Sequence, residues 1–246
     1  MAEFKYLPNA PITEALIDIR AKLPSNFNVH AFKELHEDVL KDFPLMETQK
    51  EFSADFKLEK DKPSIQTKSE GVRGYIYKSQ DKKNIVQFRR DGFTFNRLKP
   101  YTNWGDIIDK ANKLWPIYTK HSNPIKITRI ATRYINKINL PHTTQDFSIY
   151  MTSPPNNPSK EDFISGYLNR LKLFDPKHEI EVNITQSLEK GTEKEQITFL
   201  LDIDAYVNKN YDPYDPEIWD LFGNLRKKKN SVFFSSLTDN AIDLHL

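Results

Sequence analysis

The sequence predicts an α+β fold in which a mostly antiparallel sheet carries packed helices, arranged as two β-α-β-β(-β)-α pseudo-repeats. Several stretches alternate apolar and polar residues with the period of two that is typical of half-buried strands. Other stretches place apolar residues at helical spacing. A Pro-Tyr pair followed closely by tryptophan occurs at residues 100–104 and again at residues 213–219, each time between a strand pattern and a helix pattern. Together these observations predict the repeated architecture.

The first half is predicted to begin with a strand over residues 12–23, because apolar residues alternate with charged ones there. Further strands are predicted at 51–59, 72–79, 84–90 and 93–98, and helices at 29–43 and 103–118. The polar stretch 60–71 predicts a loop. Asp91-Gly92 predicts a hairpin turn, since glycine accepts the positive φ of tight turns. Pro116 is expected to kink or end the second helix.

The second half is predicted to begin with a central strand over residues 125–140, because apolar residues occupy both of its faces. Beyond a loop at 141–159, we expect a helix at 160–171 and strands at 179–188 and 196–207. Asp215 with Pro216 predicts a helix start, Lys227 to Lys229 should be its solvated end, and Thr238 should cap a short final helix. The predicted units, 1–122 and 123–246, pack as one globular body.

The composition restricts the classes of function. Basic and acidic residues number 36 and 34, so the net charge of +2 gives no overall field toward nucleic acid or an acidic membrane. The absence of cysteine excludes disulfides, thiolate metal sites and a cysteine nucleophile. No glycine-rich phosphate loop occurs. The start of the sequence lacks a signal-peptide pattern, and no apolar run approaches the roughly 20 residues of a membrane span. A cytoplasmic protein without membrane contact is therefore expected.

The strand around residues 129–139 carries the most unusual chemistry. Arg129 and Arg133 share one face of this strand, and Tyr134 and Asn136 share the other. Arginines on a strand can form an anion or phosphate site, because guanidinium groups match such ligands. The alternative is internal ion pairing, which is favoured because structural pairs often mimic sites. Its candidate carboxylates are Glu14, Asp18, Asp202 and Asp204.

Recognisable catalytic motifs are absent from the sequence. Asp202 and Asp204 lie on one strand face, roughly 7 Å apart from the strand rise, and Mg²⁺ enzymes use such pairs. No third ligand is identifiable by spacing, so these two are weak metal candidates. The histidines show no H-E-x-x-H spacing, and G-x-S-x-G does not occur, which argues against a zinc hydrolase and a nucleophile-elbow hydrolase. No catalytic residue and no cofactor are predicted.

Four segments together resemble a family of sporadically distributed prokaryotic proteins. They are residues 9–15 with an Ala-Pro-Ile-x-Glu-Ala opening, residues 101–104, residues 129–136 with Arg-x-x-x-Arg-Tyr-Ile-Asn, and residues 233–239. The resemblance spans nearly the whole chain. It implies a cytoplasmic prokaryotic protein, and it brings no catalytic residues because the family has no established activity. A sporadic distribution is also typical of mobile or phage-defence loci.

The leading functional prediction is a binding or interaction module. It would self-associate, as a homo-oligomer such as a dimer, and act with a partner protein encoded nearby. The prediction rests on the missing catalytic motifs and on a chain rich in aromatic residues and long strands. Two alternatives remain open.

The first alternative is a nucleotide- or nucleic-acid-processing protein. It would bind phosphate through Arg129, Arg133 and Asn136, with Asp202 and Asp204 as a metal pair. The second alternative is a pocket for a small ligand between the two units. Its candidate lining residues are Tyr101, Trp104 and Tyr134.

Overall fold

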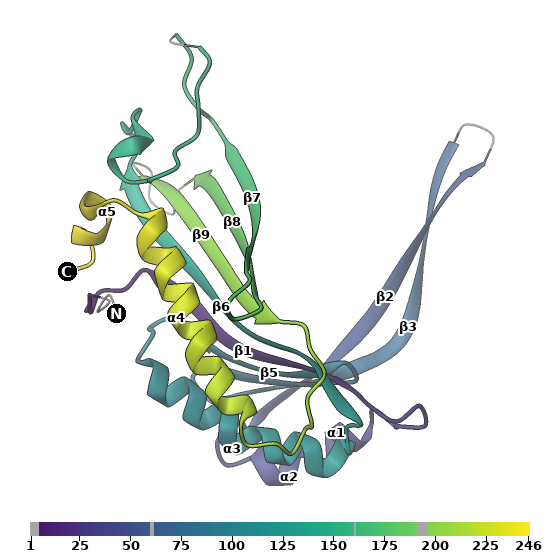
Figure 1. Cartoon of the computed structure of the whole chain (residues 1–246). Helices are drawn as coiled ribbons and strands as arrows, with labels where there is room; N and C mark the ends of the chain where they lie inside the picture. Colours follow the sequence, from purple (N-terminus) through teal and green to yellow (C-terminus); the bar gives the residue numbers. More distant parts are fainter. Residues whose placement is uncertain (1–4, 60–61, 160, 191–195) are drawn as a thin grey trace.

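The protein is built on one nine-stranded antiparallel sheet (Figure 1). The computed structural model describes residues 5–59, 62–159, 161–190 and 196–246. The strands in chain order are β1 (Ile12–Lys22), β2 (Leu45–Glu59), β3 (Lys62–Lys78), β4 (Asn84–Arg89), β5 (Gly92–Leu98), β6 (Lys126–Pro141), β7 (Tyr167–Asp175), β8 (Ile180–Lys190) and β9 (Gln196–Val207). In space they follow the order β2-β3-β4-β5-β1-β6-β9-β8-β7.

The two halves of the chain meet at the centre of this sheet. Strand β1 pairs with β5 on one side, and β6 pairs with β9 on the other. β1 and β6 then pair with each other in antiparallel orientation. The first strand of each half therefore lies beside the last strand of the same half. The predicted division between residues 122 and 123 stays a prediction, since strands from both sides of it share one sheet.

The predicted α+β class is wrong, because the sheet dominates the molecule. Strands make up 41% of the chain and helices 25%. The predicted loop at 60–71 falls largely in β3, and the predicted helix at 160–171 is overturned by strand β7. In both places the backbone pairs with a neighbouring strand. Backbone pairing of this kind can hold a polar stretch in a strand, and the side-chain pattern does not reveal it. The two stretches were therefore predicted wrongly.

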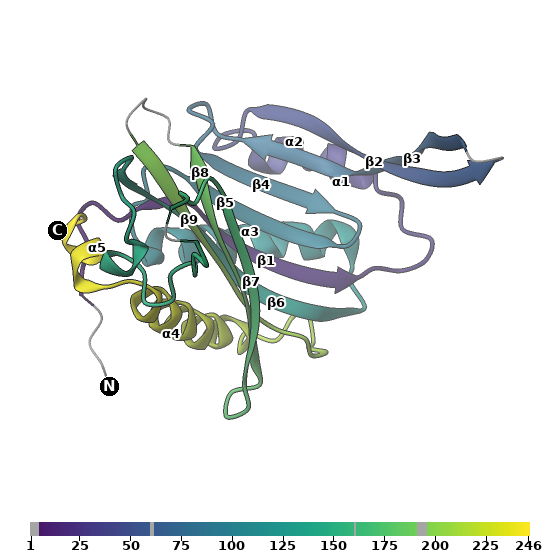
Figure 2. The ribbon, with the colours of Figure 1, turned by 90° about the horizontal axis from the view of Figure 1, so that it is seen from above.

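The helices cover one face of the sheet (Figures 1 and 2). They are α1 (Ala31–Glu34), α2 (His36–Val39), α3 (Trp104–Ser122), α4 (Ile218–Ser236) and α5 (Asp239–Asp243), with a 3-10 turn at Phe147–Ile149. Helix α3 packs against β5 and β1, and α4 packs against β6, β9 and β8. The other face, called the open face below, carries no helix in the described part of the chain. The sheet bends so that β2–β3 and β7–β9 diverge on this open side (Figure 1).

The cap of α3 agrees with the sequence prediction, whereas the end predicted at Pro116, the helix predicted at 29–43 and the start of α4 do not. The side chain of Asn103 accepts a hydrogen bond from the backbone of Asp106 at 2.9 Å and caps α3. Pro116 lies inside α3 and does not end it, so the alternative of a kink there stays a prediction. The helix predicted at 29–43 is two short pieces. Helix α4 begins after a turn in which Asp215 accepts a hydrogen bond from the backbone N–H of Glu217 at 2.8 Å.

The glycine of the β4–β5 hairpin is needed for a reason other than the turn. Gly92 already pairs with Arg89, so the turn consists of the two residues between them. Gly92 has φ +146°, and a Cβ at this position would collide with the carbonyl oxygen of Ile19 on β1. The glycine therefore permits the close approach of two strands near the centre of the sheet.

The core lies between the helices and the covered face of the sheet. In the first half it is strongly aromatic, with ring contacts among Phe32, Phe88, Phe93, Trp115 and Tyr118. The indole N–H of Trp115 donates to the carbonyl oxygen of Pro213 at 2.9 Å, which ties α3 to the loop before α4. None of the described helices combines the length and the apolar character that crossing a bilayer requires.

Candidate functional site

The sequence-predicted residues of strand β6 divide between the two faces of the sheet. Tyr134 and Asn136 are buried on the helix-covered face. The side-chain amide of Asn136 donates to the carbonyl oxygen of Leu201 at 2.9 Å, which links β6 to β9. Arg129 and Arg133 project from the open face. The structure therefore does not bring the two arginines and Asn136 into one phosphate site.

Both arginines on the open face bind carboxylates of their own chain. Arg129 donates to Asp18 at 3.0 Å and to both oxygens of Asp204 at 2.8 and 2.9 Å. Arg133 binds Asp202 through two hydrogen bonds of 2.8 and 2.5 Å. The geometry is that of internal ion pairing. Glu14, the other carboxylate considered, accepts a hydrogen bond from Asn96.

Asp18 is the centre of this open-face network. Its side chain is only 8% exposed, and it accepts hydrogen bonds from Arg89 at 2.8 Å, Arg20 at 3.0 Å and Thr94 at 2.7 Å. Burial acts to raise the pKa of the Asp18 carboxyl, but the positive charges of Arg89 and Arg20 outweigh it. The pKa therefore lies below its ordinary value, and Asp18 stays ionised in the folded protein.

The weak metal candidates are occupied by these ion pairs. Asp202 binds Arg133 and Asp204 binds Arg129, so the two carboxylates are separately neutralised. Within the described ranges, no group of three or more potential ligands is placed to hold a metal ion. These ion pairs therefore link neighbouring strands of the sheet.

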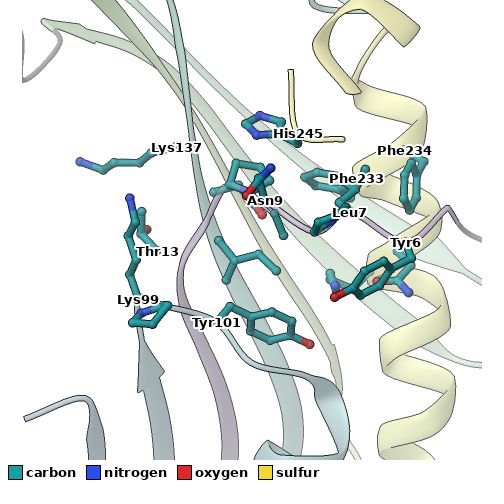
Figure 3. Close-up of a pocket in the computed structure, with 18 of the residues that line it drawn as sticks. Tyr6, Leu7, Asn9, Thr13, Lys99, Tyr101, Lys137, Phe233, Phe234 and His245 are labelled. Atoms are coloured by element: carbon teal, nitrogen blue, oxygen red, sulfur yellow. The ribbon is translucent and has the colours of Figure 1, made fainter. Parts of the chain in front are cut away.

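A large pocket lies at one end of the molecule, around the chain that enters β1, with lining residues from both faces of the sheet (Figure 3). Its volume is about 1180 Å³, and its walls come from residues before β1, the connection from β5 to α3, strand β6 and helix α4. Figure 3 shows Tyr101 and Tyr6 pointing toward each other on the α4 side of the entering chain. Lys99 and Lys137 lie on its other side.

Of the aromatic residues predicted to line a ligand pocket, Tyr101 does so directly. The Tyr101 hydroxyl lies 3.5 Å from the hydroxyl of Tyr134, which is buried behind it. Trp104 lies beside the pocket, with its ring 5.6 Å from the guanidinium of Arg226 on α4. Tyr101 and Trp104 belong to the first half, whereas Tyr134 and Arg226 belong to the second, so the pocket joins the two halves.

The pocket is strongly basic. The side chains of six cationic residues line it: Lys5, Lys99, Lys137, Arg226, Lys227 and Lys229. Among the described lining residues, Glu189 is the one acidic residue, and it pairs with Lys137 at 3.4 Å. Lys5 pairs with Asp243 at 3.4 Å. No carboxylate in the described part of the chain forms an ion pair with the remaining four cations.

Lys229 is the most unusual of these cations. Its side chain faces the sheet from α4, only 7% of the residue is exposed, and no described group forms a hydrogen bond or ion pair with its amine. The amine lies 3.7 Å from the centre of the Tyr134 ring. Burial, with a smaller effect of the nearby Arg226 charge, lowers the pKa of Lys229 to about 7. A second polar group of the pocket, Nε2 of His245, is buried and has no hydrogen-bond partner among the residues that the structure describes.

Lys229 is not among the site residues that the sequence predicts, because it lies in the basic run at 227–229, which is typical of a solvated helix end. The periodicity of α4 contains a signal that could have identified it. Phe222, Leu225, Lys229 and Phe233 repeat at helical spacing, and all four are buried. A lysine on the apolar stripe of an amphipathic helix is placed toward the core.

Comparisons with known proteins give no family for this chain. A scan against protein-family models finds no match. A search of curated proteins likewise finds no relative with significant similarity. The resemblance to a family of sporadically distributed prokaryotic proteins stays a prediction, and the proposals below rest on geometry.

Proposed function

We propose that this protein binds a small organic anion in the pocket between its two halves. The observation that carries the proposal is Lys229, a buried amine in the pocket wall that no carboxylate of the described residues neutralises. Buried charges in proteins are normally paired, because removing an ion from water costs much free energy. A bound carboxylate or phosphate would supply the missing partner of Lys229.

The surroundings of Lys229 support the same ligand class. Arg226 and Lys227 lie on the same helix and line the same pocket, and neither pairs with a carboxylate in the part of the chain that the structure describes. Tyr101 and Tyr6 provide aromatic surface on the α4 side of the entering chain (Figure 3). Pockets for small molecules typically have about 300–1,000 Å³, apolar or aromatic walls and a few placed polar groups. This pocket has such walls and enough room for a ligand larger than an inorganic ion.

The pocket is a better anion site than strand β6 with Arg129 and Arg133, called the arginine strand below. Arg129 and Arg133 are already neutralised by aspartates, so an anion there would have to displace them. Lys229 and Arg226 have no such competitor among the described residues. The small-ligand alternative is therefore better supported than the nucleotide-processing one.

Thermal unfolding with named anions tests the proposal. Citrate and inorganic phosphate should raise the Tm of the protein above that measured in chloride at equal ionic strength. A ligand at about 100 times its Kd stabilises by roughly 2.7 kcal/mol. The increase should be lost in Lys229→Met and kept in Lys113→Met, which alters an exposed lysine of α3.

Two results would count against anion binding. One is an equal Tm in chloride, phosphate and citrate. The other is an increase that persists unchanged in Lys229→Met, because the anion would then bind elsewhere on the protein. Native mass spectrometry of freshly purified protein adds an independent readout, since a retained ligand would give a mass excess that Lys229→Met lacks.

A second candidate function, docking of a partner protein, is favoured by strand β7. This strand is at the end of the sheet, and in the described structure it pairs with β8 alone. Leu168 and Phe174 are both 63% exposed, and Leu171 and Leu173 are exposed as well. An edge strand with exposed apolar side chains is suited to adding a further strand.

The charges of β7 favour an acidic partner over a second copy of this chain. Antiparallel pairing of two β7 strands about Leu171 would place Arg170 opposite Lys172, and like charges opposite each other are destabilising. We expect a nine-residue peptide that alternates glutamate with leucine to bind, and its lysine-for-glutamate counterpart not to bind. Light scattering should show a monomer. A stable dimer would instead support the predicted homo-oligomer, and equal binding of both peptides would contradict the charge argument.

A further inference from the structure

We infer that Lys229 forms an imine with a carbonyl group of the bound anion, so that the natural ligand is an aldehyde or ketone carrying a carboxylate or phosphate. The inference rests on the proposed function, because the pocket must first hold an anion. It goes further by assigning Lys229 a covalent role and by restricting the chemical class of the ligand.

The position of Lys229 separates it from the other lysines of the pocket. Lys5, Lys99, Lys137 and Lys227 are exposed, so water stabilises their ammonium forms. Lys229 is buried at the pocket wall, with its amine against the face of Tyr134. No described carboxylate is placed to keep it protonated. The pocket therefore combines exposed cations, which can hold an anionic group, with one desolvated amine.

The groups around the amine favour its neutral form. Arg226 and Lys227 on α4 are cations, and Tyr134 on β6 and Tyr101 beyond it are neutral phenols whose pKa values are raised by burial. The pKa of His245 is lowered by burial, which favours its neutral form. Glu189, the acidic residue among the described lining groups, is engaged by Lys137. With a pKa of about 7, Lys229 is half neutral at neutral pH. Desolvation next to another cation is a recognised means of activating a lysine nucleophile.

The chemical step is a reversible condensation. The lone pair of Lys229 Nζ attacks the carbonyl carbon of the ligand, and the carbonyl oxygen takes up a proton as the nitrogen loses one. The resulting carbinolamine then loses water, and a C=N bond replaces the C=O bond. Carbon and nitrogen are neither oxidised nor reduced overall, and hydrolysis of the imine returns the free amine.

Pyridoxal 5′-phosphate and pyridoxine 5′-phosphate form a matched pair of probes, since both are phosphate monoesters and only the first has an aldehyde. The protein is incubated with pyridoxal 5′-phosphate and cyanoborohydride, which reduces an imine to a stable amine, and the labelled lysines are mapped by peptide mass spectrometry. At pH 7 the neutral fraction of Lys229 exceeds that of an ordinary lysine by roughly a thousandfold. Labelling should therefore be strongly selective for Lys229 and should fall about tenfold per pH unit below pH 7.

Two variants, Lys229→Arg and Lys113→Met, serve as controls for the labelling. Lys229→Arg keeps the cation but cannot form an imine, so it should lose the label and still bind pyridoxine 5′-phosphate, measured as a rise in Tm. Lys113→Met should label at Lys229 as the parent protein does. If pyridoxine 5′-phosphate binds but Lys229 is labelled no more than exposed lysines, the imine is overturned and the anion pocket stands. If neither compound binds or labels the pocket, both proposals fail.

Discussion

Two basic regions on opposite faces of the same sheet differ in how their charges are satisfied. On the open face, Arg129 and Arg133 each bind an aspartate through two hydrogen bonds. On the covered face, Lys229 is more deeply buried and has no carboxylate partner within the described ranges. Both regions also place a cation over a tyrosine ring, at 4.3 Å for Arg129 over Tyr206 and at 3.7 Å for Lys229. The regions are therefore alike in placing a cation against a tyrosine ring, and they differ in whether a described carboxylate neutralises that cation.

This difference separates structural cations from candidate binding groups. An arginine that is neutralised by its own chain stabilises the fold and offers little to a ligand. A buried lysine without a partner destabilises the fold, and such a cost is most readily explained by a ligand that offsets it. Substitutions on the two faces should consequently have opposite effects on stability.

The largest change in the free energy of unfolding is expected from Asp18→Asn. This change removes the charge shared by Arg20, Arg89 and Arg129 and leaves the buried guanidinium of Arg89 with much of its charge uncompensated. Breaking a buried pair by removing one partner costs about 3–5 kcal/mol. Urea unfolding at pH 7 should show a loss of this size, whereas Lys209→Gln, which removes an exposed pair with Glu179, should leave the stability nearly unchanged.

The pH dependence of the stability of Asp18→Asn tests whether the effect comes from the lost charge. The folded-state pKa of Asp18 is lowered, so its contribution is present above the unfolded-state pKa and is lost as the pH falls through the folded one. The stability gap between the parent protein and Asp18→Asn should therefore close at low pH. A gap that stays constant down to pH 2 would show that Asp18 acts through packing and not through charge.

The next largest effect, with the opposite sign, is expected from Lys229→Met. Methionine fills similar space without a charge, so the variant should be more stable than the parent at pH 7 in the absence of ligand. The folded pKa of Lys229, about 7, is below its unfolded value of 10.5. Between these values the unfolded state binds more protons, so the parent gains stability as the pH rises, by at most about 1.4 kcal/mol per unit.

The advantage of Lys229→Met should consequently shrink by roughly 2–3 kcal/mol between pH 7 and pH 9. Urea unfolding at several pH values measures it, with Lys113→Met as the control whose difference from the parent should not depend on pH. If Lys229→Met were less stable than the parent at pH 7, the lysine would be a structural group and the contrast between the two faces would disappear.

Sequence patterns predicted the centre of the sheet well because side chains decide the structure there. Strands β1 and β6 lie within two residues of their predicted bounds, since alternating apolar residues face a buried layer. The ion pairing of Arg129 and Arg133 with aspartates of adjacent strands was also among the interpretations. The individual partners required the register: Arg133 is directly opposite Asp204 but binds the diagonal Asp202.

The pocket could not be predicted as a basic site because it depends on distant segments. Its wall combines the chain before β1, the connection after β5, helix α4 and the residues around His245. Lys229 belongs to a basic run that has no distinguishing feature except its position on the apolar stripe of α4. Strand β7 was missed for a different reason, because its backbone pairing with the following strand β8 leaves no trace in the composition.

A smaller effect is expected from Arg133→Gln. The Arg133 side chain is partly exposed, so its ion pair with Asp202 is screened by water and the loss should be about 1 kcal/mol. The variant also separates the two faces functionally, because the rise in Tm with citrate should be unchanged. Loss of the citrate effect without unfolding would return the arginine strand to consideration as the anion site.

The smallest effect is expected from a matched pair of hydroxyl deletions, Tyr101→Phe in the pocket and Tyr206→Phe in the open-face network. Tyr101 makes a long 3.5 Å contact with Tyr134, whereas Tyr206 donates to Glu181 at 3.1 Å. Each change should cost less than about 1 kcal/mol, and Tyr206→Phe should cost the more of the two. The Kd for pyridoxine 5′-phosphate should rise in Tyr101→Phe alone, because only that hydroxyl belongs to the pocket wall. A higher Kd in Tyr206→Phe as well would mean that the two faces are coupled through β6 and β9, and that the open-face network helps to position the pocket.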